Sequence, residues 1–486
     1  MKYFMLTIFG FLSLSACAQD SVQPNFVMLL VDDLGRQDVG VYGSSLYQTP
    51  NIDQLASDGM RFDNGYVAHP RCLPSRLGMM SGRYPASYGV PGFQDRKLGK
   101  HALPLSDTTF AEILKSAGYQ TAYIGKWHIG KEGGGPSHQG FDTSIMAGHS
   151  GATPSFFLPY EKSASGKSKK GFEPYDGGEK GEYLTDRLTD EALAFIEQKK
   201  DSPFLLILAH YAVHTPIEAP EPLSDKYRKI IADKGITRGG PKSDNDVVVD
   251  NTGQVKTVQN NPVYAAMVDS VDANLGRIVD KLDALGLSEN TVIILTSDHG
   301  GLSSRGLDST RELATSNLPY RHGKGWLYEG GIRVPMIVKW PAKVKAGSVS
   351  QVQLTGTDHY PSLLAMAGLP LQPEHHRNGE SYMPALLGEN YQRSPMFWHS
   401  SLGRPAQTGD TRSSAVIDGE WKLIQWYSLT DESIERVELF NLVADPGERQ
   451  DLSRQQPQKV DELQAMLNEW KSSVNARLGR FKHSGI

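Results

Sequence analysis

The chain has 486 residues, of which 22% are charged and 39% hydrophobic, and its formal net charge is −5. This is the composition of an ordinary globular protein, long enough for a sizeable core and a second, smaller unit. The mild acidity, without a basic stripe, argues against a nucleic-acid partner.

The first 17 residues are typical of a targeting segment. Lys2 precedes a short apolar run over residues 3–14, which is too short to span a bilayer. Residues 14–17 (Leu-Ser-Ala-Cys) resemble a bacterial lipobox, which implies cleavage before Cys17 and lipidation of its sulfur. The alternative is a plain signal peptide with an incidental cysteine. We therefore expect an exported protein, either an outer-membrane lipoprotein or a periplasmic one.

The chain has only two cysteines, Cys17 and Cys72. If Cys17 is lipidated, Cys72 is the only remaining thiol and has no partner for an intramolecular disulfide. In residues 72–76 (Cys-Leu-Pro-Ser-Arg), Pro74 suits the first turn of a helix. Cys72 is thus expected at a helix N-terminus, where the backbone N–H groups favour an anion.

Two predicted strands in the first third of the chain end in charged residues. Residues 25–31 form an apolar run typical of a strand buried in a parallel sheet, and Asp32 and Asp33 follow at once. Two buried neighbouring carboxylates need a cation or strong donors, although a solvated turn is the alternative. Residues 121–124 predict a second strand, after which Lys126 and His128 point the same way and suit an anionic substrate. A solvated strand end is the alternative there.

The pattern repeats later in the chain. A buried strand over 203–209 precedes His214, a candidate acid or base or else a hydrogen-bonded loop histidine. A strand over 291–296 precedes Asp298 and His299. Asp298 can join the first two acids only if the two strands are neighbours, which the sequence alone does not establish. Helices are predicted over 184–199, 264–285 and 354–368, and a further strand over 334–340.

From about residue 385 the pattern changes to short antiparallel strands, over 396–399, 414–417, 421–427 and 437–442, followed by a helix over 460–478. This predicts a main domain over 24–385 and a smaller α+β subdomain over 386–486. Loops at 132–160, 233–262 (with a hairpin at 247–258) and 303–322 are expected to line a pocket. His322, with Arg321 and Arg305, could contact an anionic ligand in that pocket; the alternative is surface charge.

Taken together, these motifs resemble one known family. Residues 72–76 are similar to the C-x-P-S-R signature of type I sulfatases, in which the cysteine is oxidised to formylglycine. The other family motifs follow in order: Asp32 with Asp33, residues 125–128 (Gly-Lys-Trp-His), His214, Asp298 with His299, and residues 324–331. The chain most resembles the bacterial polysaccharide-sulfatase branch, partly through residues 182–187 and 211–214. The resemblance implies an alkaline-phosphatase-like α/β fold, with a large, mostly parallel sheet flanked by helices and a C-terminal α+β subdomain.

The resemblance also implies a role for each motif residue. One calcium ion would be held by Asp32, Asp33, Asp298 and His299 together with the formylglycine at position 72. His299 is the least expected ligand, because many members carry Asn there and calcium prefers oxygen. Catalytic roles fall to Cys72, Arg76, Lys126, His128, His214 and Lys324, and substrate contacts to Lys126, His214, Lys324 and His322.

The expected function is therefore a sulfatase that acts on a sulfated polysaccharide or oligosaccharide. It would depend on a formylglycine-generating enzyme and meet the membrane only through its lipid anchor. Two alternatives remain. A phosphatase or phosphonate hydrolase of the same superfamily would use Ser, Thr or unmodified Cys and usually two transition metals. A non-catalytic, lipid-anchored glycan-binding protein would have lost Cys72, Lys126 or His214, and all three are present.

Overall fold

The computed structural model describes residues 23–89, 102–130, 134–160, 177–236 and 246–479, with the single residues 162, 166, 172 and 175. The expected targeting segment, with Cys17, lies outside the described residues. Within them, no helix is both long enough and apolar enough to cross a membrane.

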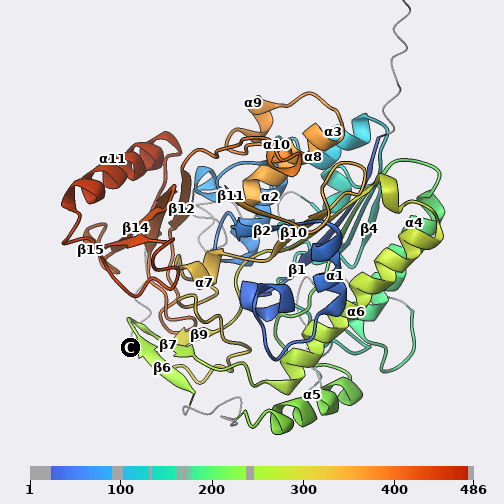
Figure 1. The fold of residues 1–486 in the computed structure, drawn as a ribbon, viewed down its shortest axis with the longest axis horizontal. Coiled ribbons are helices and arrows are strands. Elements are labelled where there is room, and N and C mark those ends of the chain that lie inside the picture. Colours follow the sequence, from blue (N-terminus) through green and yellow to red (C-terminus); the bar gives the residue numbers. More distant parts are fainter. Residues whose placement is uncertain are drawn as a thin grey trace, which may run out of the picture.

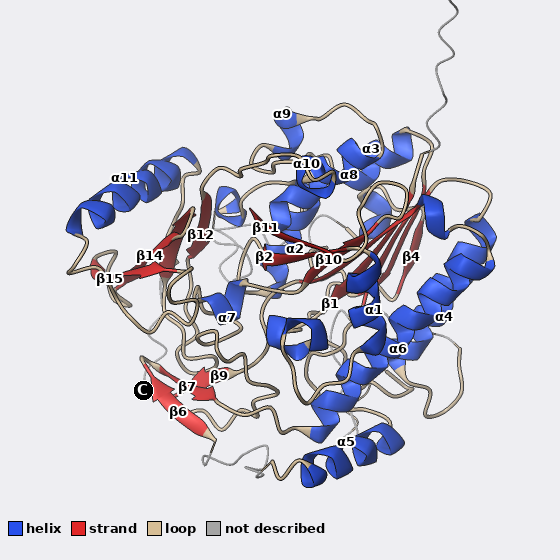
Figure 2. Cartoon of the chain, in the orientation of Figure 1, coloured by secondary structure: helices blue, strands red, loops and turns tan. Residues whose placement is uncertain are grey.

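An eight-stranded sheet forms the centre of the described structure (Figures 1 and 2). Strand β10 runs antiparallel to its two neighbours, and the other strands are parallel to one another. The carboxyl ends of the parallel strands therefore meet at one edge, where ligands bind in open α/β sheets. In spatial order the strands are β11 (Ser348–Leu354), β2 (Met60–Gly65), β10 (Met336–Lys339), β8 (Thr291–Ser297), β1 (Asn25–Val31), β5 (Phe204–Ala209), β3 (Gln120–Gly125) and β4 (Thr143–Ile145).

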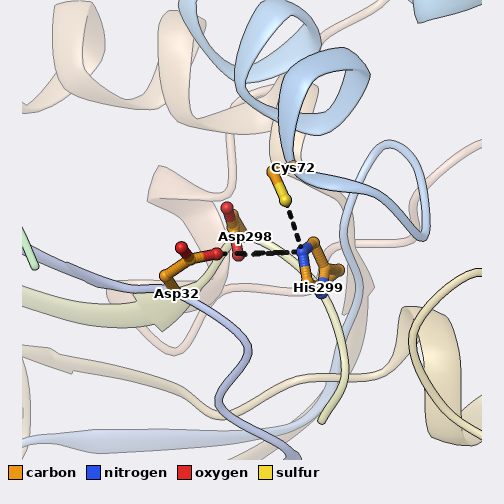
Figure 3. Close-up of side chains that lie close together, drawn as sticks. All are labelled: Asp32, Cys72, Asp298 and His299. Atoms are coloured by element: carbon orange, nitrogen blue, oxygen red, sulfur yellow. Dashed lines mark hydrogen bonds and ion pairs between the residues drawn. The ribbon is translucent and has the colours of Figure 1, made fainter. Parts of the chain in front are cut away.

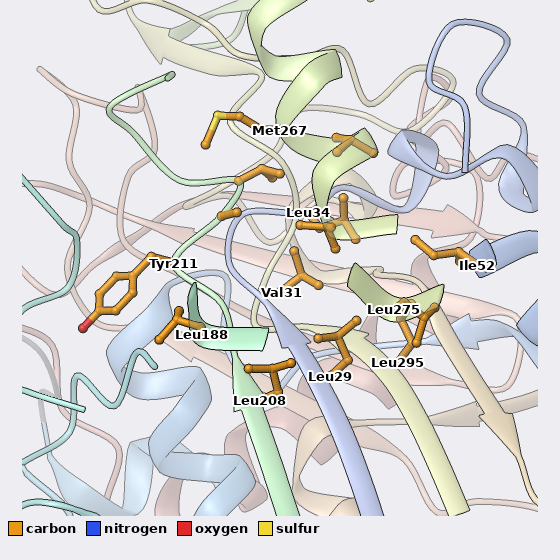
Figure 4. Packing of buried hydrophobic residues seen from close by; sticks show 14 of the residues in the cluster. Leu29, Val31, Leu34, Ile52, Leu188, Leu208, Tyr211, Met267, Leu275 and Leu295 are labelled. Carbon is orange, nitrogen blue, oxygen red and sulfur yellow. The ribbon is translucent and has the colours of Figure 1, made fainter. Parts of the chain in front are cut away.

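Helices cover both faces of this sheet, and β1 shows why. Its alternate residues Val27, Leu29 and Val31 belong to one core, whereas Phe26, Met28 and Leu30 belong to the core on the other face. Because successive side chains of a strand point to opposite faces, a continuous apolar run is the pattern of a strand buried on both. Figure 4 shows Leu29 and Val31 packed near Leu275 of a long covering helix.

The first core is covered by α1 (Pro50–Asp58), α4 (Leu184–Lys199), α5 (Glu221–Asp233) and α6 (Pro262–Ala284). The second is covered by α2 (Cys72–Ser81), α3 (Phe110–Ser116), α8 (His359–Met366) and α10 (Met383–Leu386). Two four-residue helices, α7 (Glu329–Ile332) and α9 (Pro373–His376), complete this part of the chain. The mostly parallel α/β architecture expected from the sequence is confirmed.

The C-terminal strands form a separate antiparallel sheet beside the main one (Figure 1). Its strands are β12 (Met396–Ser400), β13 (Ser413–Asp418), β14 (Trp421–Tyr427) and β15 (Ile434–Asn441), and α11 (Pro457–Ser473) packs on it through Leu463 and Leu467. Buried Lys422 of β14 lies 2.9 Å from Glu329 of α7 and 2.7 Å from Glu448. This ion cluster fixes the C-terminal sheet to the segment that carries Lys324.

A third, three-stranded sheet comprises β6 (Val247–Asp250), β7 (Gly253–Lys256) and β9 (Ser304–Gly306). It confirms the predicted hairpin at 247–258. The predicted helix over 354–368 was wrong at its start: Leu354 ends β11, a single 3-10 turn follows, and α8 covers only His359–Met366. Strands β2, β4 and β11 and helices α3 and α5 were not predicted. Strand β11 lies at the sheet edge and alternates half-buried with exposed residues, so its apolar signal is weak.

His210 follows β5 directly, is fully buried, and has no hydrogen-bond partner for either ring nitrogen among the described residues. Burial lowers the pKa of this imidazole from 6.5 to about 3. Between those two pH values the unfolded chain binds a proton that the folded chain does not. The stability that depends on His210 being neutral is therefore fully present above pH 6.5, and it is lost as the pH falls below that value.

We expect the free energy of unfolding to fall by roughly 3 kcal/mol between pH 7 and pH 4 on account of this residue alone. Urea titrations at both pH values give the difference in the free energy of unfolding between pH 7 and pH 4. In His210→Leu this difference should be smaller than in the wild type by that amount. His138→Leu, which alters an exposed histidine, is the control and should keep the wild-type difference. An unchanged difference in His210→Leu would contradict the assignment.

Candidate active site

Cys72 is the first residue of α2 and lies in a pocket of about 370 Å³. Its thiol is free and nearly buried, with 7% of the residue exposed. The ring nitrogen Nε2 of His299 lies 3.1 Å from Sγ of Cys72, and Figure 3 shows both pointing toward Asp298 and Asp32. The predicted helix start at Cys72 is confirmed, and it places this side chain over the carboxyl edge of the main sheet.

The acids that follow β1 and β8 meet beneath Cys72. The two strands are direct neighbours, with Val31 in register with Ser297, so Asp32 and Asp298 emerge side by side. Ligand atoms of Asp32, Cys72, Asp298 and His299 all lie within 4.8 Å of one another. The strand pairing, which the sequence alone left open, brings the two acidic motifs together.

Not every oxygen of these carboxylates has a hydrogen-bond donor. Asp32 Oδ1 and Asp33 Oδ2 are buried, and neither has a hydrogen-bond partner among the described residues. Burial, and then the negative charge of Asp298, raise the pKa of Asp32 well above its usual value. Since an isolated buried carboxylate is costly, the free oxygens fit a site for a hard cation such as calcium.

Three cations surround the acids, one to each. Lys126 Nζ lies 2.5 Å from Asp32 Oδ2, and Lys324 Nζ lies 2.6 Å from Asp33 Oδ1. Arg76, one turn into α2, donates from Nε to Asp298 Oδ2 at 2.8 Å. Although burial alone would raise the pKa of the Cys72 thiol, Lys126 and Lys324 hold it well below its usual value. The site thus stabilises negative charge at position 72.

The three histidines that were predicted for the site differ in charge. Burial lowers the pKa of His128 to about 4 and that of His214 to about 3, so both rings are neutral at pH 7. Burial also acts against His299, but the charges of Asp298 and Cys72 raise its pKa to about 9 in the absence of a cation. His214 donates from Nδ1 to the carbonyl of Thr215 at 2.7 Å, which leaves Nε2 free at 3.9 Å from Asp33 Oδ2.

His322 does not lie in this pocket, which corrects the expectation that it contacts substrate. Its ring is fully buried and stacks on Trp326 with centroids 3.7 Å apart. Its ring nitrogens face Ser304 at 3.2 Å and Asp250 at 3.4 Å. Trp326 and Tyr328, which stack on His322, follow it closely in the chain, but no pattern in this stretch of sequence indicates that the ring is buried.

The predicted rim loops contribute only in part. Loop 132–160 supplies Gly151 and Ala152 and loop 303–322 supplies Arg311, whereas no described residue of 233–262 lines the pocket. The remaining wall was not predicted from the sequence. It comprises His69 and Arg71 before α2, and Ser401, Leu402, Arg404 and Gln407 from the loop between β12 and β13.

Comparisons with known proteins agree with this geometry. The sequence model of the Sulfatase family matches residues 24–369, and the model described as N-sulphoglucosamine sulphohydrolase, C-terminal, matches residues 321–475. The N-acetylgalactosamine-6-O-sulfatase of Bacteroides thetaiotaomicron is 28% identical, with 93% of this chain and 94% of the relative aligned. The human N-acetylgalactosamine-6-sulfatase is 30% identical, covering 83% of this chain and 72% of that protein.

Among solved structures, the crystal structure of Ps i-CgsB in complex with k-i-k-neocarrahexaose superimposes with a TM-score of 0.75. The two sequences are 29% identical, and 95% of each chain is covered. The match extends over both the main sheet and the C-terminal sheet, so the fold is the alkaline-phosphatase-like one. The chain belongs to the sulfatase family of sulfuric ester hydrolases.

Proposed function

We propose that the protein hydrolyses sulfate esters of a sulfated polysaccharide or oligosaccharide, using a formylglycine made from Cys72 and one bound calcium ion. The observation that carries the proposal is the position of Cys72. It lies at a helix N-terminus above three buried acids, with Lys126 and Lys324 at its sides. The substrate class is supported by the similar N-acetylgalactosamine-6-O-sulfatase and by the similar structure that was solved in complex with k-i-k-neocarrahexaose.

The residues present fit a calcium ion. Asp32 and Asp298 lie in one cluster with Cys72 and His299, and Asp33 lies in an adjoining cluster with Cys72 and His214. Asp32 Oδ1 and Asp33 Oδ2 have no hydrogen-bond partner among the described residues. His299 Nε2 lies 3.1 Å from Asp33 Oδ1 and could also bind the ion, although nitrogen is a less favoured ligand for calcium. When bound, the ion would stabilise negative charge on the reacting group and on the sulfate, and the hydrated aldehyde would supply the attacking hydroxyl.

Side chains of the protein would then bind the sulfate, position residue 72 and transfer protons. Lys126 and Lys324 bind the sulfate oxygens and stabilise the charge that grows in the transition state. Arg76, held by Asp298, positions the reacting group at residue 72. His214, whose Nε2 is free, holds the proton for the leaving sugar oxygen, because a bound sulfate raises its affinity for a proton. Neutral His128 accepts a proton from residue 72 when sulfate is expelled.

Sulfate release tests this proposal. Matured protein, supplied with calcium, should release sulfate from at least one member of a panel of defined sulfated oligosaccharides, measured by ion chromatography. It should also cleave an aryl sulfate faster than the matching aryl phosphate, because residues 72–76 carry the C-x-P-S-R signature. Faster release of phosphate would favour the phosphatase alternative, and release of neither would favour a binding protein.

We further propose that the protein is exported, lipidated at Cys17 and matured by a formylglycine-generating enzyme. The lipobox-like residues 14–17 and the signature at 72–76 support this. Mass spectrometry of the protein from its native host tests both points. A mature N-terminus other than a lipidated Cys17 would contradict the anchor.

A further inference from the structure

The pocket and its surroundings carry more positive charge than one sulfate ester requires. Lys126, Lys324 and Arg76 are each paired with an acid of the metal cluster. Arg71, at the pocket wall, is paired with buried Asp410 at 2.6 Å. Arg311 and Arg404 also line the pocket, and no carboxylate lies within ion-pair distance of either guanidinium among the described residues. None of the described residues that line the pocket is acidic.

The two unpaired arginines come from different parts of the chain. Arg311 is half-buried and follows β9, whereas Arg404 is exposed in the loop between β12 and β13. They face the same pocket as Cys72, together with the amide of Gln407. Arg404 is repelled by the positive charges around it. The charge of Arg71, and then desolvation, lower the pKa of Arg404 to about 10, and the charge of Arg311 contributes to this lowering. An anion placed between them would relieve this repulsion.

Hydrogen bonds hold the loop that carries Arg404 in place. Trp326 donates from Nε1 to the carbonyl of Thr408 at 2.8 Å, and Thr252 donates from Oγ1 to the carbonyl of Gly409 at 2.7 Å. Asp410 of the same loop binds Arg71, the residue that precedes Cys72. The loop is therefore pre-organised relative to the reacting residue, as a specificity site requires.

We propose that Arg311 and Arg404, with Gln407, form a second anion-binding subsite that holds a carboxylate or a second sulfate of the same glycan. The inference rests on the proposed sulfatase function and narrows it. The substrate is a glycan with at least two anionic groups, one cleaved at residue 72 and one retained at the two arginines. Guanidinium groups suit both anions because they bind either in a bidentate manner.

The test measures binding and turnover separately. Three oligosaccharide probes of one backbone are compared: one sulfate only, two sulfates, and one sulfate with a uronate carboxylate. Their dissociation constants are measured by calorimetry on the Cys72→Ala protein, and their kcat/KM values on the matured protein. We expect a preference of at least about tenfold for a two-anion probe, on the scale of one charge-assisted hydrogen bond. The probe that is preferred identifies the retained anion as a sulfate or as a carboxylate.

Arg311→Gln and Arg404→Gln should each reduce this preference about threefold, the double variant should bring it near unity, and Arg404→Lys should retain part of it. Arg454→Gln, an exposed arginine elsewhere in the C-terminal part, is the matched control for net charge and should leave the preference unchanged. A wild-type protein without preference, or a preference that survives in the double variant, overturns the subsite. If the preference appears in binding but no probe and no aryl sulfate is cleaved, the subsite stands and the proposed hydrolysis fails.

Discussion

Cys72→Ala is expected to leave a folded protein whose sulfatase activity is reduced at least about 10⁴-fold, because the attacking group is absent. The folded state should survive, since Cys72 lines a pocket and carries no disulfide. Steady-state kinetics on an aryl sulfate gives the activity. Circular dichroism and the midpoint of thermal unfolding, which should stay within a few degrees of the wild type, report the fold.

Cys72→Ser provides the matched control, because it keeps the size of the side chain and offers a hydroxyl. In a host that matures only cysteine, it should be as inactive as Cys72→Ala. In the active wild type, residue 72 should have lost one sulfur and two hydrogens and gained one oxygen. The peptide that contains it should therefore be lighter than the encoded peptide. Full activity in Cys72→Ala, or an active wild type with an unmodified thiol, would refute the formylglycine mechanism.

Removal of calcium is expected to have the second large effect. Treatment with a chelator should abolish turnover and lower the unfolding midpoint by several degrees, and added calcium should restore both. Calcium at a hundred times its dissociation constant stabilises the folded state by about 2.7 kcal/mol. Here the ion would also neutralise the buried repulsion between Asp32 and Asp298. Differential scanning fluorimetry with calcium, magnesium and chelator measures the shift independently of activity.

Two variants separate a bound ion from a general salt effect. Asp32→Asn should lose the calcium-dependent shift, because it removes a carboxylate of the cluster. Asp272→Asn is the control: this buried acid of α6 accepts hydrogen bonds from Ile52 N–H at 2.8 Å and from Asn51 Nδ2 at 2.8 Å at the start of α1, and the variant should keep the shift. Equal midpoints with calcium and with chelator in the matured wild type would rule out the ion.

Much of the site could be predicted from the sequence because its signals are local. The apolar run at 25–31 predicted a strand buried on both faces, and the structure confirms it as β1 at the sheet centre. Pro74 predicted the helix start that places Cys72 at the N-terminus of α2. The order of acids, lysines and histidines after successive strands indicated the sulfatase family, which the comparisons confirm.

The sequence alone did not determine which strand ends meet or which polar side chains reach the pocket. The pairing of β1 with β8 joins residues about 265 positions apart, and no periodicity in the sequence encodes it. His322 and Arg404 show two opposite errors in predicting pocket residues from the sequence. His322 looked like a pocket residue and is buried under Trp326, whereas Arg404, in a loop of the C-terminal sheet, lines the pocket. Local composition fixes the type of element, but the long-range packing of two sheets decides which side chains surround Cys72.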